Sequence, residues 1–482
     1  MITVRCFDSF AQAAFVRDAA DALNRDSARP DPFSTFKYFE HFYRCDESHP
    51  AGRGLQLWLL AAFRGQQLIG YAALRRVTRR VLGIVNVPVL GFLVTRDSDR
   101  PHVVARAEDL RDVSSAFYAH LLARHREWSL LEFRQQDGSS LLRKPAAAVD
   151  LKGHLVSDWT SLENGTVQIR WTTLRDYFQA LPAKFRRNLA RQLQGLLGAG
   201  RVELLGSSNP LTTPALFELY LGIEQRSWKS QAQAHIARSP LRVGYFRGLL
   251  GADQPMRVSI QLLLFDGVPI AGLINGAFRD GLYALHMAYD DRFARFAPGS
   301  ATMLMGVREA IESGASFFNL LSGSGYYKSR WLADITETRD VQIYRRGSWL
   351  YWRRWVGDLL RRLRPTAGPA APARFNAARR AASAHLPRSA PLDAAELERI
   401  GSLVAQARDG QAQFLSASAF AAVLPLERAA PLTPALSRKP ESKCHPGESA
   451  TPCSTRGQDP GRWISAKGGS RRSPISANIK CP

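Results

Sequence analysis

The segment from residue 258 to residue 321 constrains the fold more than any other part of the chain, because short apolar runs alternate there with turn residues. The first two runs flank Asp266-Gly267, a dipeptide that favours a tight hairpin turn. A helical pattern separates the third run from the fourth. The runs are Val258–Phe265, Ile270–Phe278, Leu282–Tyr289 and Phe317–Leu321, and the helical segment is Gly299–Gly314. Three meandering strands, a helix and a further strand predict a mixed α/β unit.

Earlier segments extend this pattern to two lobes. Residues 1–150 hold an aromatic helical stretch, Phe33–Tyr43, and two apolar runs around Arg64-Gly65-Gln66, which predict a helix and a strand pair. Residues 165–346 begin with a basic helical region, Thr173–Leu197, and continue with further helical patterns before the strands described above. We therefore expect a first α/β lobe over 1–150 and a second over 165–346.

Charge and composition separate the last quarter of the chain from these lobes. The 482 residues carry 65 Lys+Arg and 42 Asp+Glu, a net charge of +23, and residues 353–482 supply 21 − 9 = +12 of it. We expect a basic aromatic helix at 347–364, a linker with Ala-rich helices at 365–430, and a disordered basic tail at 431–482. The five cysteines form no CxxC pair, and no signal peptide or membrane-spanning run is evident, so a cytoplasmic location is the default.

A Pro-Gly-Ser turn opens the predicted helix in the second lobe. Such a turn exposes backbone N–H groups at a helix N-terminus, where the helix dipole favours an anion, and Gly299 would let a phosphate approach closely. Ser300 is a typical N-cap residue, and Arg295 lies just upstream. The turn therefore indicates either an anion site or an ordinary helix cap.

Two further segments carry candidate functional side chains. Gly323–Trp331 follows a predicted buried strand, where Lys328 would neutralise charge that develops in a transition state, unless the segment is a structural turn with stacked aromatics. In the basic helix, four polar side chains recur at i, i+3, i+4 and i+7 and share one face, which is either a solvated face or a contact for an anionic substrate. They are Lys184, Arg187, Asn188 and Arg191.

Four stretches together resemble GNAT-superfamily acyltransferases of the CelD/BcsL type, which are related to the Fem peptidyl transferases. They are LPAKFRRNLARQLQGLLGAGRVEL (181–204), EQRSWK (224–229), DGVPIAGLINGAFRDGLYALHMAYDDRFARFAPGS (266–300) and GASFFNLLSGSGYYKSRW (314–331). The resemblance covers about 170 residues in matching order, and residues 1–150 look like a degenerate first GNAT-like lobe. It implies an α/β (α+β) fold of two tandem GNAT-like lobes, with mixed central sheets flanked by helices.

The resemblance also implies an activity and a donor. It implies transfer of an acyl group from acetyl-CoA or another acyl-CoA, with no metal, to an amine or hydroxyl of a saccharide or cell-envelope precursor. The diphosphate of coenzyme A would lie at Arg295, Pro298, Gly299, Ser300 and Ala301. This loop departs from the usual R/Q-x-x-G-x-G/A form, since Pro298 removes one backbone donor and Ala301 replaces the second glycine. Fem-type relatives use aminoacyl-tRNA instead, which would make tRNA the one expected nucleic-acid partner.

Roles for single residues follow from the same resemblance. Tyr327 or Tyr326 would protonate the departing thiolate, with Lys328 beside it, while Tyr326, Trp228 and the basic helix face would contact substrate. Candidate general bases are Glu224, Asp290, Asp291 and His286. Asp290 is also typical of a residue that caps a helix or turns the chain. A lone strand histidine such as His286 is more often packed in the core than catalytic. No G-x-S-x-G elbow, HExxH motif or P-loop occurs, which excludes the corresponding hydrolases, zinc proteases and ATPases.

The segment Ser348–Arg364 places tryptophans and leucines on one helical face with arginines beside it. This pattern suits peripheral contact with an anionic membrane surface, or a helix that packs its tryptophans on the core. The leading hypothesis is thus a cytoplasmic acyltransferase, either free in solution or peripheral at the inner face of a membrane. The alternatives are a Fem-like aminoacyl or peptidyl transferase, a non-catalytic subunit of a polysaccharide synthase, and a nucleic-acid binder indicated by charge alone.

Overall fold

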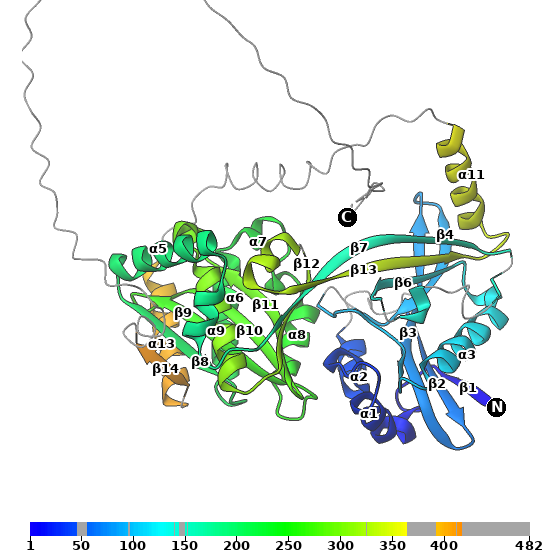
Figure 1. Ribbon diagram of the computed structural model, residues 1–482, viewed down its shortest axis with the longest axis horizontal. Coiled ribbons are helices and arrows are strands. Elements are labelled where there is room, and N and C mark those ends of the chain that lie inside the picture. The colour runs from blue at the N-terminus through cyan, green and yellow to red at the C-terminus, as the bar shows by residue number, and fades with distance from the viewer. Residues whose placement is uncertain are drawn as a thin grey trace, which may run out of the picture.

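The computed structural model shows two lobes that share one mixed sheet of 14 strands (Figure 1). It describes residues 1–45, 55–94, 97–138, 140–143, 150–151, 153–323, 325–363, 392–410 and 412–416. The predicted tail at 431–482 lies outside these residues. The strand order is β1-β2-β3-β4-β6-β13-β7-β12-β11-β10-β9-β8-β14, with β5 paired to β3. The predicted mixed α/β architecture is therefore confirmed.

The first lobe is a sheet with helices on both faces. Its strands are β1 (Ile2–Phe7), β2 (Gln56–Arg64), β3 (Gln67–Val81), β4 (Val85–Phe92), β5 (Val104–Ala105) and β6 (Leu130–Gln136), and its helices are α1 (Arg17–Arg25), α2 (Phe36–Arg44) and α3 (Leu110–Ala123). The apolar run of β2 is buried on both faces. Leu57 and Leu59 join the core under α1 and α2, and Trp58 and Leu60 join the core under α3, as strand alternation requires.

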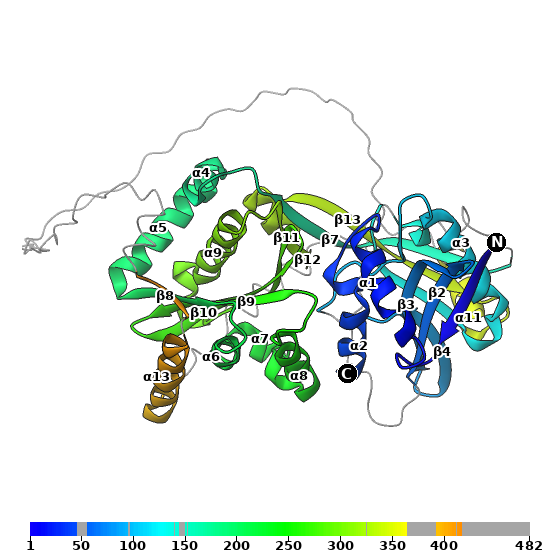
Figure 2. The same ribbon diagram turned by 90° about the horizontal axis from the view of Figure 1, so that it is seen from below.

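The second lobe also has three layers. Its strands are β8 (Val202–Ser207), β9 (Arg257–Phe265), β10 (Val268–Phe278), β11 (Gly281–Tyr289) and β12 (Phe317–Gly323). Figure 2 shows α4 (Leu174–Ala180), α5 (Ala183–Ala199) and α9 (Pro298–Glu312) on one face. The other face carries α6 (Thr213–Gln225), α7 (Trp228–Gln231), α8 (Pro240–Leu249) and α13 (Ala394–Asp409). The predicted Asp266-Gly267 hairpin is confirmed, because both residues have positive φ (49° and 80°), as a type I′ turn requires.

Two long strands that the sequence analysis did not identify join the lobes. β7 (Leu155–Gln168) and β13 (Asp334–Tyr344) pair with each other, and β13 also pairs with β6 while β7 also pairs with β12. Figure 1 shows both strands running from one lobe to the other. The segment predicted as a linker with Ala-rich helices also contributes to the second lobe, since α13 packs on α6 and β14 (Gln413–Ser416) pairs with β8.

Side chains of the two lobes also form one continuous core on the side of α2 and α8. Residues from α1 and α2 belong to the same buried cluster as residues from α6 and α8. Within it, the hydroxyl groups of Tyr38 and Tyr245 lie 2.6 Å apart. In chain order, α10 (Gly325–Lys328) lies between β12 and β13, and α11 (Trp349–Leu363) follows β13. None of the described helices is both long and apolar enough to span a bilayer.

Candidate active site

A cavity opens where the parallel strands β11 and β12 separate. The two strands pair only over Gly281–Tyr283 and Phe317–Asn319. Beyond this point β12 stays paired with β7, through Ser322 and Gly323, and β11 stays paired with β10. The cavity has a volume of about 400 Å³. The strand residues that line it include Ala284, Leu285, His286 and Met287 from β11 and Leu320, Leu321 and Ser322 from β12.

Both lobes contribute to the walls of this cavity. The first lobe supplies Asp97, Ser98 and Gln135, which give the wall a polar character. The second lobe adds Met303 from α9 on one face of the sheet and Arg242 from α8 on the other. The cavity therefore has an apolar part between the strands and a polar part at the junction of the lobes.

A β-bulge determines where His286 points. The register of β11 against β10 shifts between His286 and Ala284, so Leu285 is the extra residue. Before the bulge, Tyr283 belongs to the core on the α6 and α8 side; after it, Ala288 does. Regular alternation from Leu282 would place His286 toward α9. The bulge instead turns the imidazole toward α6 and α8, which a sequence pattern does not reveal.

The imidazole of His286 lies in a cluster of ionisable side chains. Its Nδ1 lies 2.6 Å from the Tyr220 hydroxyl and 3.5 Å from Glu224 Oε1. Its Nε2 lies 3.1 Å from Lys229 Nζ and 3.2 Å from an Arg242 guanidinium nitrogen. Lys229 Nζ also lies 3.4 Å from Nδ1, so both ring nitrogens have polar neighbours. The orientation of the imidazole is therefore fixed from both sides.

Glu224 and Lys229 lie at the buried end of this cluster. The Glu224 carboxylate accepts the Ile236 N–H at 2.7 Å, and Lys229 Nζ donates to the Met287 carbonyl at 2.6 Å. Burial raises the pKa of Glu224, and burial lowers the pKa of Lys229 to about 8. Glu224 is fully buried and contacts His286 from behind, so any effect it has on a substrate passes through the imidazole.

An ion pair closes the polar end of the cavity across the lobes. The Arg242 guanidinium donates to both carboxylate oxygens of Asp97, at 2.8 Å and 2.6 Å, and to the Ala234 carbonyl at 2.9 Å. Both charged side chains are less than 10% exposed. A bidentate pair of this kind fixes the angle between its partners, so it holds the first lobe against α8.

The motif after β12 is divided between the cavity and the protein interior. Tyr327 lines the cavity and is 39% exposed, as a residue that meets a substrate would be. Lys328 is buried, packs against the backbone of Gly165 in β7, and donates to the Leu321 carbonyl. Burial lowers the pKa of Lys328 to about 8. The Tyr326 side chain lies outside the described part of the structure.

The turn before α9 differs from the predicted anion cradle. Ala297, with φ of 51°, is the N-cap, so Ser300 does not cap the helix as predicted. The carbonyl of Ala297 accepts the N–H groups of Ser300 (2.8 Å) and Ala301 (3.3 Å), and Pro298 has none. Within the described structure, Gly299 alone keeps a first-turn amide without a backbone acceptor, next to the exposed Arg295. Of the several backbone N–H groups that the sequence predicted to be exposed at this turn, only that of Gly299 therefore remains as a donor in the described structure.

Asp290 has a structural role in the fold, and its predicted catalytic role stays a prediction. It is fully buried and forms ion pairs with Arg226 at 2.9 Å and Arg292 at 2.6 Å. It also caps the following 3-10 helix by accepting the Arg292 N–H. Its carboxylate does not line the cavity. Burial, with the neighbouring charge of Asp290, raises the pKa of Asp291 to about 6, but Asp291 does not line the cavity either.

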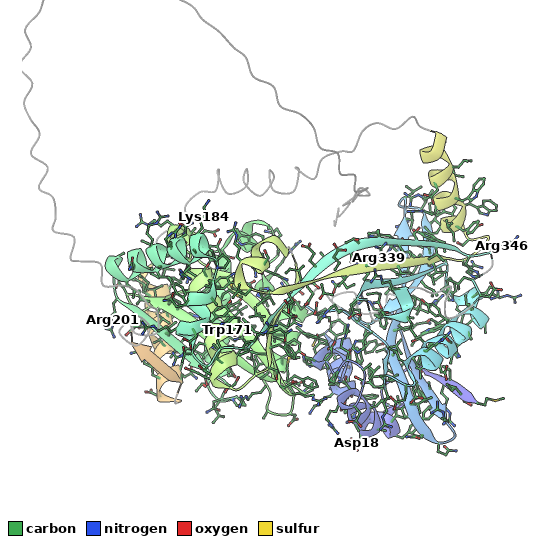
Figure 3. All side chains as sticks on the ribbon, in the orientation of Figure 1. Asp18, Trp171, Lys184, Arg201, Arg339 and Arg346 are labelled. Carbon is green, nitrogen blue, oxygen red and sulfur yellow. The ribbon has the colours of Figure 1, made fainter. Side chains whose placement is uncertain are left out.

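The four polar residues of the basic helix share the exposed face of α5, as predicted. Lys184, Arg187, Asn188 and Arg191 are exposed, while Leu189, Leu193 and Leu196 on the opposite face are buried. Figure 3 shows Lys184 on the outer side of α5. Trp228 is also exposed, at the start of α7. None of these residues lines the cavity, so their contact with substrate stays a prediction.

Of the residues named from the sequence, Tyr327 and His286 line the cavity and Glu224 contacts His286, whereas most of the polar wall was not predicted. Arg242 and Asp97 are 145 residues apart in sequence, and neither lies in a recognisable motif. In the described part of the chain, no group of three or more His, Cys, Asp or Glu side chains is placed to bind a metal ion.

Comparison with known proteins assigns the core of this site to a class. Residues 183–329 match the family model described as "Acetyltransferase (GNAT) domain". The match runs from α5 through α10, so it includes β11, β12 and α9, and the second lobe carries a GNAT acetyltransferase domain. No curated protein matches the chain.

Several solved structures are similar to this chain at low sequence identity. FemX is 10% identical, with a TM-score of 0.44, over 67% of this chain and 95% of its own. A tandem GNAT protein from the clavulanic acid biosynthesis pathway is 12% identical, with a TM-score of 0.44, over 72% and 99%. The C-terminal domain of a putative lysylphosphatidylglycerol synthetase from Agrobacterium fabrum is 14% identical, with a TM-score of 0.41, over 72% and 96%.

Proposed function

We propose that this chain transfers an acyl group, most simply acetyl, from an acyl-CoA to an amine or hydroxyl of a saccharide or cell-envelope precursor. The observation that supports it best is the cavity between the separated strands β11 and β12, inside the segment that matches the GNAT model. The apolar part between the strands suits the acyl chain and thioester. Arg295 and the Gly299 N–H would meet the diphosphate of the donor at the α9 turn.

The proposed reaction needs little beyond alignment, because a thioester is already activated. The acceptor nitrogen or oxygen attacks the thioester carbonyl, the C–S bond breaks, and the carbonyl becomes part of an amide or ester. The acceptor loses a proton and the departing thiolate gains one. His286 lies at the cavity wall with Glu224 behind it and would help to remove the acceptor proton, while Tyr327 would supply the proton to sulfur.

The polar end of the cavity supports a hydroxyl-rich acceptor. Ser98, Gln135 and Ser322 line it, and each side chain offers hydrogen bonds without a net charge. The Arg242–Asp97 pair is neutral as a whole. Such a wall favours a saccharide over a strongly charged acceptor. We also propose that the chain is cytoplasmic and that it belongs to the CelD/BcsL type of GNAT acyltransferases.

A Fem-like transfer from aminoacyl-tRNA is the second candidate, and two observations favour it. The α9 turn offers one amide to a diphosphate rather than several, which weakens the case for coenzyme A. The face of α5 made by Lys184, Arg187, Asn188 and Arg191 offers exposed positive charge to a polyanion. Both candidates place the acyl group in the same cavity and differ only in the carrier.

The test is thiol release from acetyl-CoA and longer acyl-CoA thioesters by the purified chain, with amino sugars and neutral sugars as acceptors. Ala284 lines the cavity, so Ala284→Phe should fill it and abolish transfer; Ala199→Phe, at an exposed position on α5, should not. Transfer from charged tRNA alone would select the second candidate. If neither donor is consumed with any of these acceptors, the chain is not an acyltransferase, and a non-catalytic role in a polysaccharide synthase becomes the better account.

A further inference from the structure

An exposed apolar surface lies on the first lobe, and two segments that do not line the cavity form it. The first is α11, on which Trp349, Trp352, Trp355, Val356, Leu359 and Leu360 are 37–54% exposed. The second is the turn between β3 and β4, where Leu82 and Ile84 are 67% and 78% exposed. Figures 1 and 2 both show the β3–β4 hairpin beside α11. We call these two segments together the α11 patch.

Packing holds the two parts of the α11 patch together. Leu350 and Tyr351 near the start of α11 belong to the same apolar cluster as Val81 and Val85, which flank the hairpin turn. The hairpin projects past its neighbour, because β3 pairs with β2 only as far as Arg76. The hairpin tip and the exposed face of α11 therefore have a fixed common base.

The turn at the hairpin tip is unfavourable for folding and for solubility. Leu82 has φ of 52°, in the left-handed region that favours Gly or Asn, and Gly83 follows at 72°. A leucine there is strained, and its side chain extends into solvent. Ile84 adds a second large apolar side chain. Strain of this kind at an exposed position points to a function, since Asn would fold better.

The chemistry around the α11 patch selects its partner. Residues 348–364 contain five arginines and one aspartate. The Arg353 guanidinium lies 5.6 Å from the Trp349 ring, and Arg80 is exposed on the hairpin. Two copies of such a patch would bring like charges together. Tryptophans with arginines beside them instead match the border between lipid headgroups and acyl chains of an anionic bilayer.

We propose that the α11 patch binds an anionic lipid surface, with Leu82, Ile84 and the α11 tryptophans inserted below the headgroups. The sequence analysis left membrane contact and packing on the core as alternatives for 348–364, and the hairpin tip is a second insertion point that the sequence did not indicate. This proposal does not rest on the proposed acyl transfer. The arginines contact lipid phosphates, and the chain stays on one side of the bilayer.

The test is co-sedimentation of the full chain with vesicles of phosphatidylcholine alone and of phosphatidylcholine mixed equally with phosphatidylglycerol. We expect binding to the mixed vesicles that weakens as salt is added, and little binding to the neutral ones. Leu82→Asn should weaken binding by about tenfold while raising the Tm, because it removes both the inserted side chain and the strain. Because the Tm rises while binding weakens, misfolding of the variant cannot be the cause of the weaker binding.

Matched variants complete the experiment. Trp352→Ser with Trp355→Ser should weaken binding at least as much as Leu82→Asn. Leu211→Asn changes a leucine that is 85% exposed on the other lobe and should change nothing. If Leu82→Asn and the tryptophan pair bind mixed vesicles as the unaltered chain does, the proposal is wrong and any binding belongs to other basic residues. If the unaltered chain forms a dimer that these variants abolish, a second copy covers the patch and the proposal is also wrong.

Discussion

The ion pair between Arg242 and Asp97 should be a main determinant of how the two lobes hold together. Removing one partner of a buried, bidentate pair leaves the other charge without compensation, at a cost of about 3–5 kcal/mol. Arg242→Met and Asp97→Asn should each lower the free energy of unfolding by about that amount. The double variant buries neither charge. Its loss in free energy of unfolding should therefore be smaller than the sum of the losses in the two single variants, with a coupling energy of about 2–5 kcal/mol.

The assay is urea unfolding followed by tryptophan fluorescence and by circular dichroism, for the four members of the cycle. The two probes should report the same transition in the unaltered chain, because β7 and β13 connect the lobes in one sheet. Arg242→Met should separate the transitions, since the lobes then lose a shared contact. A coupling energy below about 0.5 kcal/mol would show that Arg242 and Asp97 act independently and would refute this account of the junction.

Three further results are expected. Asp290→Asn should lower the free energy of unfolding by about 3 kcal/mol, since Arg226 and Arg292 lose their partner, and should leave kcat within about twofold; a large fall in kcat in a stable variant would restore Asp290 as catalytic. Burial lowers the pKa of Lys229 from 10.5 to about 8, so between these values the unfolded chain binds a proton that the folded chain does not, and stability should rise with pH by at most about 3 kcal/mol. Lys328 has the same shift, so Lys229→Met should remove about half of the slope in urea titrations; an unchanged slope contradicts the assignment. Tyr327→Phe should lower kcat by about tenfold or more with an unchanged Tm, and full activity would exclude Tyr327 as the proton donor.

Local sequence signals predicted the parts of the fold that depend on local chemistry. The Asp266-Gly267 turn required positive φ at two adjacent residues, and few dipeptides other than Asn-Gly and Asp-Gly provide it. β7 was missed because many of its residues are partly exposed, so its apolar residues do not form a run. β13 was missed for the same reason, because many of its residues are also partly exposed and polar. Both strands are defined by pairing partners that are distant in sequence.

The candidate site depends on tertiary geometry more than the predicted parts of the fold do. The bulge at Leu285 reverses the direction of His286, and the sequence of β11 contains nothing that marks it. At the α9 turn, the positive φ of Ala297 directs its carbonyl to the Ser300 N–H and uses a donor that the sequence leaves apparently free. The polar wall needed residues from both lobes. A motif search confined to the second lobe does not find Asp97.

The most direct test of the central claim is a crystal structure of the chain with a thioether analogue of acetyl-CoA. The account predicts electron density for the acyl end between β11 and β12, within contact of Leu320 and Met287, with the diphosphate near Arg295 and the Gly299 N–H. Density for the analogue elsewhere, with the space between the two strands still empty, would contradict it.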